Sequence, residues 1–256
     1  MQKRTLGRQG LEVSAIGYGA MGLTMAYGPT DEEAGVAALR RAHDLGITFF
    51  DTAEMYGWGT GSNEILVGKA VRDFREDVVL ASKFGVDMSV PPEQIGGALN
   101  SRPDNIRKSL FERDAETLFP TLEELGVGFV AYSPLGRGFI TGTAKPAGQY
   151  EATDIRTVDP RWQPGNFEKN VEAVDRLAEL AATKGATVSQ LALAWLLTRG
   201  EHIVPIPGTR SPKRIEDNAG AADLTLTDTD LKAIDEILPH GGFGARYTEG
   251  HVPTWI

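Results

Sequence analysis

Polar residues or glycine follow four apolar runs of the sequence, at the point where each run ends. Asp51 comes directly after "ITFF", Lys83 after "VVLAS", Ser133 after "FVAY" and Gly208 after "IVPIP". In α/β proteins, whether barrels or open sheets, the carboxyl ends of the strands form the face on which active sites are built. We therefore expect these four residues to share one rim.

Asp51, Lys83 and Tyr56, which lies in the loop after Asp51, have the side chains of a proton donor and its tuning partners. An ammonium group beside a phenol stabilises the phenolate and lowers a pKa that is about 10 in model peptides. A carboxylate holds the ammonium group charged and in place. The trio therefore predicts general acid catalysis by Tyr56. The alternative interpretation is a strand-end salt bridge beside an ordinary loop tyrosine.

A helix with basic residues at its start follows the last apolar run. In "PGTRSPKRIEDN", Ser211 is a favourable N-cap and Pro212 a favourable first helical residue, so the helix should begin there. Lys213 and Arg214 in its first turn oppose the helix dipole by about 0.3–1 kcal/mol each, which makes sense if they surround an anion. We expect a phosphate there, held by backbone amides, the helix end and guanidinium groups. The alternative is a solvated basic turn. The residues concerned are Gly208, Thr209, Arg210, Lys213 and Arg214.

A second and weaker phosphate signal is "SPLGRG" at residues 133–138, where glycines permit a close approach of the backbone and Arg137 supplies charge. Two phosphate sites at neighbouring strand ends indicate a dinucleotide with an additional phosphate. "GYGAMG" at residues 17–22 does not have the G-x-G-x-x-G spacing, so a two-domain Rossmann enzyme is not expected.

The elements that must position these residues alternate between strand and helix, which is typical of βαβ units. A hairpin around Arg8-Gln9-Gly10 is expected to open the chain. Residues 142–165 have no clear periodicity, and a loop of that length is usually a lid or a binding loop. Buried strands are expected at residues 13–17 and at the four apolar runs named above. Helices are expected near residues 30–45, 63–72, 103–110, 112–125, 171–184 and 189–199, and from residue 211 onward.

The strand count does not suit the length. A (β/α)8 barrel usually has about 250 residues, and this chain has 256, but only five buried strands can be recognised. The gap lies between Lys83 and Phe129, where two helical stretches follow each other with no β-branched apolar run between them. A crossover between neighbouring parallel strands needs one helix. The sequence is therefore irregular near residues 109–111, and the agreement in length is accidental.

Composition and charge exclude several classes. There are 26 Lys and Arg against 35 Asp and Glu, for a net charge of −9, which argues against nucleic acid as a partner. With no cysteine and four histidines that follow no apolar run, no metal site is expected. No stretch approaches the roughly 18 apolar residues of a membrane span, and no signal peptide is recognised. We expect a cytoplasmic protein.

The motifs resemble those of the aldo-keto reductases, in particular the bacterial and plant branch of NADPH-dependent aldehyde and ketone reductases. The segments that carry the resemblance are "FFDTAEMYGWGTGSNEILVGKAV", "VVLASKFG", "VGFVAYSPLGRGFITG", "QLALAWLL" and "IVPIPGTRSPKRIEDN". The resemblance implies a (β/α)8 TIM barrel closed at its base by an N-terminal hairpin, as a single domain over residues 1–256. It also implies a small-molecule carbonyl substrate, NADPH as cofactor, and hydride transfer with Tyr56 as proton donor.

The resemblance assigns roles residue by residue. Asp51, Tyr56 and Lys83 correspond to the Asp, Tyr and Lys of the family's catalytic tetrad. Tyr132 would stack on the nicotinamide, and Ser133, Leu135 and Arg137 would line the pyrophosphate path. The adenosine 2′-phosphate and the adenine would be held by Gly208, Thr209, Arg210, Arg214, Asp217 and Asn218.

The chain departs from the family after "RPDNIRKSL", where family members continue with the strand that ends in the tetrad histidine and with two further βα units. About three units, or roughly 70 residues, are absent, and "LFERDAETLFPTLEELG" follows directly. Either the polypeptide carries a segment that this chain lacks, or the segment is deleted. We prefer the first interpretation, because a five-strand arc exposes unpaired edges and the barrel interior.

Two other functions stay open. An NADPH-binding protein with weak or no turnover, serving redox sensing or partner binding, is favoured if the histidine segment is truly deleted. A phosphate-binding isomerase or lyase on an open α/β sheet is a weaker third hypothesis. Candidate substrate-pocket residues are Met21, Tyr27, Trp58 and residues 241–256. The sequence predicts neither the substrate nor the oligomeric state.

Overall fold

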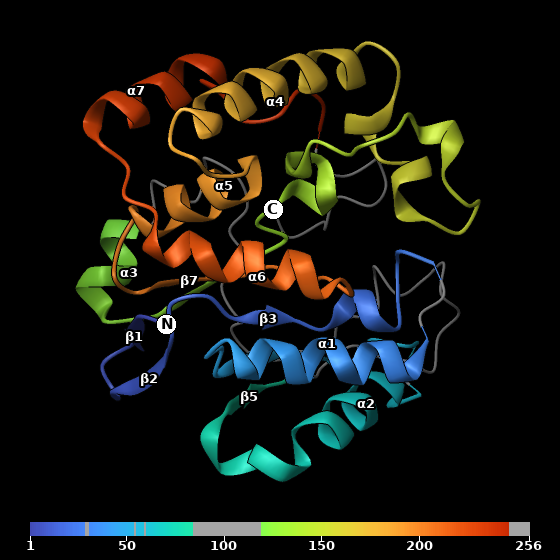
Figure 1. The fold of residues 1–256 in the computed structure, drawn as a ribbon, viewed down its shortest axis with the longest axis vertical. Helices are drawn as coiled ribbons and strands as arrows, with labels where there is room; N and C mark the ends of the chain where they lie inside the picture. Colours follow the sequence, from blue (N-terminus) through green and yellow to red (C-terminus); the bar gives the residue numbers. More distant parts are fainter. Residues whose placement is uncertain (29–30, 54, 59, 84–118, 246–256) are drawn as a thin grey trace.

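Parallel strands with helices packed outside them make up the structure, a computed structural model that describes residues 1–28, 31–53, 55–58, 60–83 and 119–245 (Figure 1). The strands are β1 (Lys3–Leu6), β2 (Leu11–Ser14), β3 (Tyr18–Gly19), β4 (Phe49–Asp51), β5 (Val79–Ala81), β6 (Phe129–Tyr132) and β7 (Ile203–Ile206). The α-helices are α1 (Glu32–Asp44), α2 (Ser62–Val71), α3 (Phe119–Leu125), α4 (Asn166–Ala182), α5 (Val188–Leu197), α6 (Pro212–Gly220) and α7 (Asp228–Ile237).

The N-terminal hairpin is confirmed. β1 and β2 pair antiparallel, with Arg4 opposite Val13. The buried Arg4 guanidinium donates to the carbonyl oxygens of Leu197, Gly200 and Ile203, which ties the hairpin to the region where α5 ends and β7 begins. The expected first parallel strand at residues 13–17 is wrong, because Val13 is used in the hairpin and the parallel strand starts only at β3.

The parallel strands form one series. β3, β4 and β5 pair in that order, and β6 pairs with β7. The two groups are joined because the Gly17 amide donates to the Pro205 carbonyl at 2.9 Å and the Gly19 amide to the Pro207 carbonyl at 3.4 Å. The spatial order is therefore β5-β4-β3-β7-β6. Five parallel strands were expected, and five are seen in the described residues, where they form an arc rather than a closed barrel.

Two glycines permit the close approach at the junction of β3 and β7. A Cβ atom on Gly19 would lie 2.7 Å from the Ile206 carbonyl oxygen, and one on Gly208 would lie 2.5 Å from the Gly19 carbonyl oxygen. Both obstacles are backbone atoms, which cannot move aside without disturbing the strands. Any side chain at either position would therefore push the two strands apart.

The helices cover the outside of the arc in two groups. In α1 the buried residues Ala38, Leu39 and Ala42 recur at helical spacing and belong to a core shared with α2. The two helices lie side by side (Figure 1). In α4 the buried residues Val174 and Leu177 face a second core shared with α5 and α7. This is the amphipathic pattern of surface helices. None of the helices among the described residues is both long enough and apolar enough to span a membrane.

Several helix boundaries differ from those expected. α1 begins at Glu32, two residues later than expected, after Asp31, whose carboxylate accepts from the Ala34 amide at 2.9 Å. α4 begins earlier than expected, after Gly165, whose φ of +90° suits glycine. The prediction that Ser211 caps α6 is confirmed, with the Arg214 amide 3.5 Å from Ser211 Oγ. Residues 142–165 contain three short 3-10 turns. The expected helix at 103–110 and the irregular point at 109–111 lie outside the described residues.

Candidate active site

The pairing of β4 with β5 brings Asp51, Tyr56 and Lys83 together. Asp51 ends β4 opposite Ala81, and Lys83 follows shortly after β5. Lys83 Nζ donates to Asp51 Oδ1 at 2.5 Å, to the Thr52 carbonyl oxygen at 2.9 Å and to Tyr56 Oη at 3.2 Å. The ammonium group therefore connects the carboxylate to the phenol, in the arrangement that the spacing predicted.

Burial shifts the pKa values of two members of this trio. It raises the pKa of Asp51, and the charge and hydrogen bond of Lys83 lower that pKa by less. Burial likewise raises the pKa of Tyr56 above its ordinary value, although the charge of Lys83 opposes the rise. The expectation that Lys83 leaves Tyr56 with a lowered pKa is wrong in its net sign, because desolvation of the phenolate is the larger effect. Tyr56 is accordingly a neutral phenol at pH 7 with a proton to donate.

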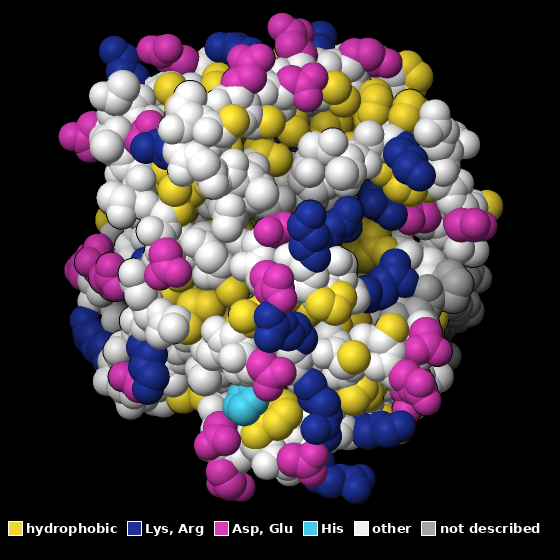
Figure 2. Space-filling model, in the orientation of Figure 1, with side chains coloured by type: hydrophobic (Ala, Val, Ile, Leu, Met, Phe, Trp, Pro, Cys, Tyr) yellow, Lys and Arg dark blue, Asp and Glu magenta, His cyan; other side chains and the backbone are white. Residues whose placement is uncertain are grey.

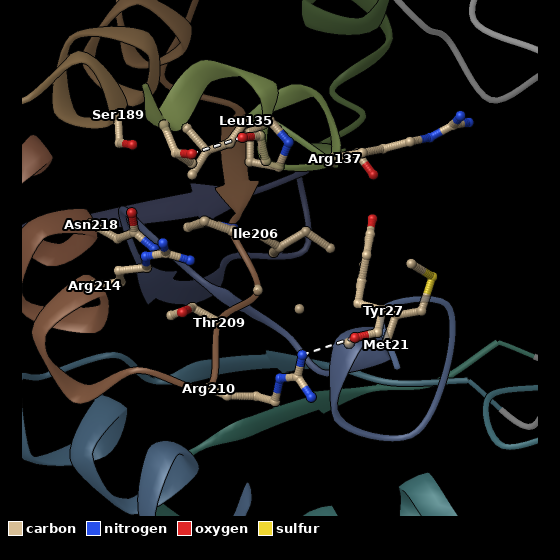
Figure 3. Close-up of a pocket in the computed structure, with 18 of the residues that line it drawn as sticks. Met21, Tyr27, Leu135, Arg137, Ser189, Ile206, Thr209, Arg210, Arg214 and Asn218 are labelled. Atoms are coloured by element: carbon tan, nitrogen blue, oxygen red, sulfur yellow. Dashed lines mark hydrogen bonds between the residues drawn. The ribbon is translucent and has the colours of Figure 1, made fainter. Parts of the chain in front are cut away.

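A cavity of about 490 Å³ runs from this trio across the carboxyl ends of β3, β7 and β6 to α6 (Figure 3). A volume in this range is typical of sites for small molecules and cofactors. Every residue predicted for catalysis or cofactor binding lines it except Lys83, which contacts two of the others. The predicted residues that line the cavity are Asp51, Tyr56, Tyr132, Ser133, Leu135, Arg137, Gly208, Thr209, Arg210, Arg214, Asp217 and Asn218.

The helix side of the cavity carries cations at the N-terminal end of α6. Lys213 and Arg214 lie in the first turn and are exposed, and Arg214 donates to Thr143 Oγ1 at 3.4 Å. Within the described part of the chain, neither has an ion pair with a carboxylate. Figure 2 shows a group of basic side chains around a hollow in this face of the molecule. The helix side therefore offers positive charge and helix-end amides to an anion.

The loop side of the cavity also has arginines, but their charges are compensated. Arg137 forms an ion pair with the buried Asp159, and in Figure 3 its side chain extends away from Arg214. Arg156 makes a bidentate pair with Asp154, with distances of 2.9 and 2.6 Å. The Arg156 guanidinium also lies over the rings of Tyr27 and Tyr150, at 5.2 and 3.9 Å from their centres.

The segment after β6 reaches across to the loop after β3. The Ile155 amide donates to the Ala26 carbonyl oxygen at 3.3 Å, and Arg210 donates to the Tyr27 carbonyl oxygen at 2.9 Å (Figure 3).

Met21 and Tyr27 line the cavity, as predicted, whereas Trp58 and residues 241–245 do not. Residues 246–256 lie outside the described part of the chain. The sequence reasoning missed Arg156, and the only signal was the long aperiodic stretch that contains it.

No group of three or more histidine, aspartate or glutamate side chains suited to a metal ion is found among the described residues. Around the cavity the described residues bring together a phenol, an ammonium group, a carboxylate and a basic helix end. In an α/β structure with an N-terminal hairpin, this arrangement suits the class of site that holds a phosphorylated ligand beside a group able to donate a proton.

Comparison with known proteins agrees with that class. The model of the aldo/keto reductase family matches residues 15–110 and 104–239. A probable aldo-keto reductase from Glycine max is 36% identical, over 98% of this chain and 93% of that protein. An NADP(+) aldo-keto reductase from Schizosaccharomyces pombe is 32% identical, over 93% of this chain and 92% of its own length. The chain therefore belongs to the aldo/keto reductase family.

Solved structures show the same fold. A glycerol dehydrogenase from Gluconobacter oxydans aligns with a TM-score of 0.74 at 23% identity, over 99% of this chain and 97% of its own. An aldo-keto reductase from Klebsiella pneumoniae in complex with NADPH aligns with a TM-score of 0.65 at 23% identity, over 97% and 99%.

Proposed function

We propose that this protein reduces aldehydes or ketones to alcohols with NADPH, and that Tyr56 donates the proton to the substrate oxygen. The observation that carries the proposal is one continuous cavity that has the Tyr56–Lys83–Asp51 trio at one end and the basic start of α6 at the other. A dinucleotide that reached from α6 to the trio would place its reactive ring beside the proton donor.

The residues present fit NADPH by the chemistry of their donors. Lys213 and Arg214 at the start of α6 suit a terminal phosphate such as the adenosine 2′-phosphate, together with Thr209 and Arg210. The S. pombe relative is named for NADP(+), and the K. pneumoniae structure holds NADPH, which supports the choice. Arg137 suits a pyrophosphate less well than the sequence suggested, because Asp159 already compensates its charge.

Bound NADPH would supply a hydride to the carbonyl carbon, and the residues of this chain would do the rest. Tyr132, with 36% of its surface exposed at the end of β6, offers a ring on which a planar group can stack. Tyr56 holds its proton at pH 7 and can hydrogen-bond the carbonyl oxygen. Lys83 stabilises the phenolate that forms, and Asp51 keeps Lys83 in place.

The proposal is tested by Tyr56→Phe, with the rate of NADPH consumption measured on an aromatic aldehyde. General acid catalysis contributes about a hundredfold to ten thousandfold, so we expect a loss of kcat of that order. NADPH binding, followed by fluorescence titration, should stay close to that of the native protein. Full activity of the variant would overturn the role of Tyr56.

We also propose that this chain lacks about three βα units that other members of the family have. Two observations support this absence. The two matches to the family model meet at residues 104–110, and the alignment with the soybean protein covers 324 positions although this chain has 256 residues. The difference is close to the roughly 70 residues that three such units occupy. The absent part would include the tetrad histidine.

That absence favours a second candidate function, an NADPH-binding protein with little or no turnover. The intact mass of the purified protein shows whether the units are deleted or are present in the polypeptide but missing from this sequence. A mass near 27.6 kDa establishes a deletion. Turnover by a protein of that mass would exclude the second candidate.

A further inference from the structure

Asn63 contacts the residue that follows Asp51, and its side chain is completely buried. It sits in the first turn of α2, which follows the loop that carries Tyr56. Its exposed fraction is 0%. A buried amide without partners is costly, so its hydrogen bonds show what its position requires.

The Asn63 amide joins three segments that surround the site. Its Nδ2 donates to the Ala20 carbonyl oxygen at 2.9 Å, just after β3, and to Thr24 Oγ1 at 2.7 Å. Its Oδ1 accepts from Thr52 Oγ1 at 2.6 Å, just after β4. These contacts need two donors and one acceptor on a short side chain, which asparagine supplies and which aspartate and leucine do not.

Two of these contacts lead directly to the trio. Thr52, whose hydroxyl is held by Asn63, presents the carbonyl oxygen that accepts from Lys83 Nζ at 2.9 Å. Ala20, whose carbonyl is held by Asn63, donates its own amide to the Asp51 carbonyl oxygen at 2.8 Å. The peptide groups around Asp51 are thus fixed from both sides by one side chain.

We propose that Asn63 is a positioning residue for the reduction. It holds Thr52, and Thr52 in turn holds the Lys83 ammonium group beside Tyr56. This inference rests on the proposed function. Asn63 touches none of the reacting groups, but it sets the distance between the Lys83 ammonium group and the Tyr56 phenol. A small displacement of a catalytic group can cost a large part of the rate, because the geometry of the reacting atoms is lost.

The first test is Asn63→Leu, of similar volume but with no polar atoms, assayed with NADPH and 4-nitrobenzaldehyde. We expect kcat to fall about tenfold to a hundredfold. The dissociation constant for NADPH should change by less than about threefold, because the residues proposed to bind its phosphate lie at the start of α6, away from Asn63. The alkaline limb of the kcat profile should move to higher pH, since Lys83 lowers the pKa of Tyr56 and its displacement removes that effect.

The matched control is Thr227→Ala, which removes the N-cap of α7 and destabilises the protein without touching the cavity. If both variants have the same kcat and pH profile at a temperature where both are folded, Asn63 is only structural and the proposal is wrong. An equal loss of NADPH affinity and kcat in Asn63→Leu would also overturn it, because the effect would then be on the whole fold.

A second pair of variants keeps the proposal testable if Asn63→Leu does not fold. Thr52→Ser retains the hydroxyl that donates to Asn63, whereas Thr52→Val removes it. We expect Thr52→Ser to keep kcat close to the native value and Thr52→Val to lower it about tenfold. Equal activity of the two would contradict the link through Thr52.

A titration separates failure of this inference from failure of the proposed function. The ultraviolet difference between the native protein and Tyr56→Phe reports ionisation of Tyr56 without any turnover. If the native protein does not reduce the aldehyde, the proposed function fails. The positioning role still stands if Thr52→Val or Asn63→Leu raises the pKa of Tyr56 in this titration, and it falls if the pKa is unchanged.

Discussion

The two sides of the cavity hold positive charge in different ways. On the loop side, Arg137 and Arg156 are each paired with a carboxylate that is almost completely buried, Asp159 and Asp154. On the helix side, Lys213 and Arg214 lie exposed against the positive end of α6, and no carboxylate pairs with them in the described residues. Paired charges of the first kind stabilise the fold, whereas charges placed against a helix dipole are unfavourable until an anion binds among them. We propose that the loop-side cations are structural and that the helix-side cations bind a ligand.

The largest effect should follow from breaking a loop-side pair. Asp159→Asn leaves the mostly buried Arg137 without its countercharge, and breaking a buried pair costs about 3–5 kcal/mol of unfolding free energy. Denaturant unfolding measures the loss. Asp175→Asn, at an exposed position of α4, is the control and should stay within about 0.5 kcal/mol of the native protein. A stable Asp159→Asn variant that bound NADPH more tightly would instead mean that Arg137 binds phosphate.

A smaller effect, and one on binding rather than stability, is expected on the helix side. Arg214→Ala should weaken NADPH binding about tenfold, or 1.4 kcal/mol, and leave NADH binding nearly unchanged. The same variant should unfold no more easily than the native protein, and removing a cation from this helix end can add about 0.3–1 kcal/mol. Fluorescence titration and denaturant unfolding give the two values. The control is Lys232→Ala on α7, and equal losses for both cofactors would remove the assignment of a 2′-phosphate site.

The smallest effect concerns the pH dependence of stability. Burial raises the pKa of Asp154, but the hydrogen bonds and charge of Arg156 lower it more, so it lies below its ordinary value. The resulting stability is present above the unfolded pKa, about 3.9, and is lost as pH falls through the lower folded value. Asp154→Asn should therefore lower stability at neutral pH and flatten its decline below about pH 4. Unfolding measured from pH 6 to about pH 2 gives the two slopes. Parallel curves would show that the pair contributes nothing.

The features that the sequence predicted are those set by local pattern. The cap at Ser211 depends on neighbouring residues, and the placement of Asp51 and Lys83 depends on where apolar runs stop. The features it missed depend on packing at a distance. The sign of the shift at Tyr56 follows from burial, the partner of Arg137 lies in an aperiodic loop, and β3 begins late because the hairpin uses Val13. Asn63 could not be distinguished from an ordinary helix-start asparagine until its three partners were seen.

The glycine contact between β3 and β7 makes the site depend on both ends of the chain. It joins a strand from the beginning of the chain to one near its end, and the cavity lies across that junction. During synthesis, Asp51, Tyr56 and Lys83 leave the ribosome long before Arg214 and Asn218. The cavity therefore cannot be complete until β7 and α6 have been made, and a chain truncated before β7 lacks the wall that these two elements supply.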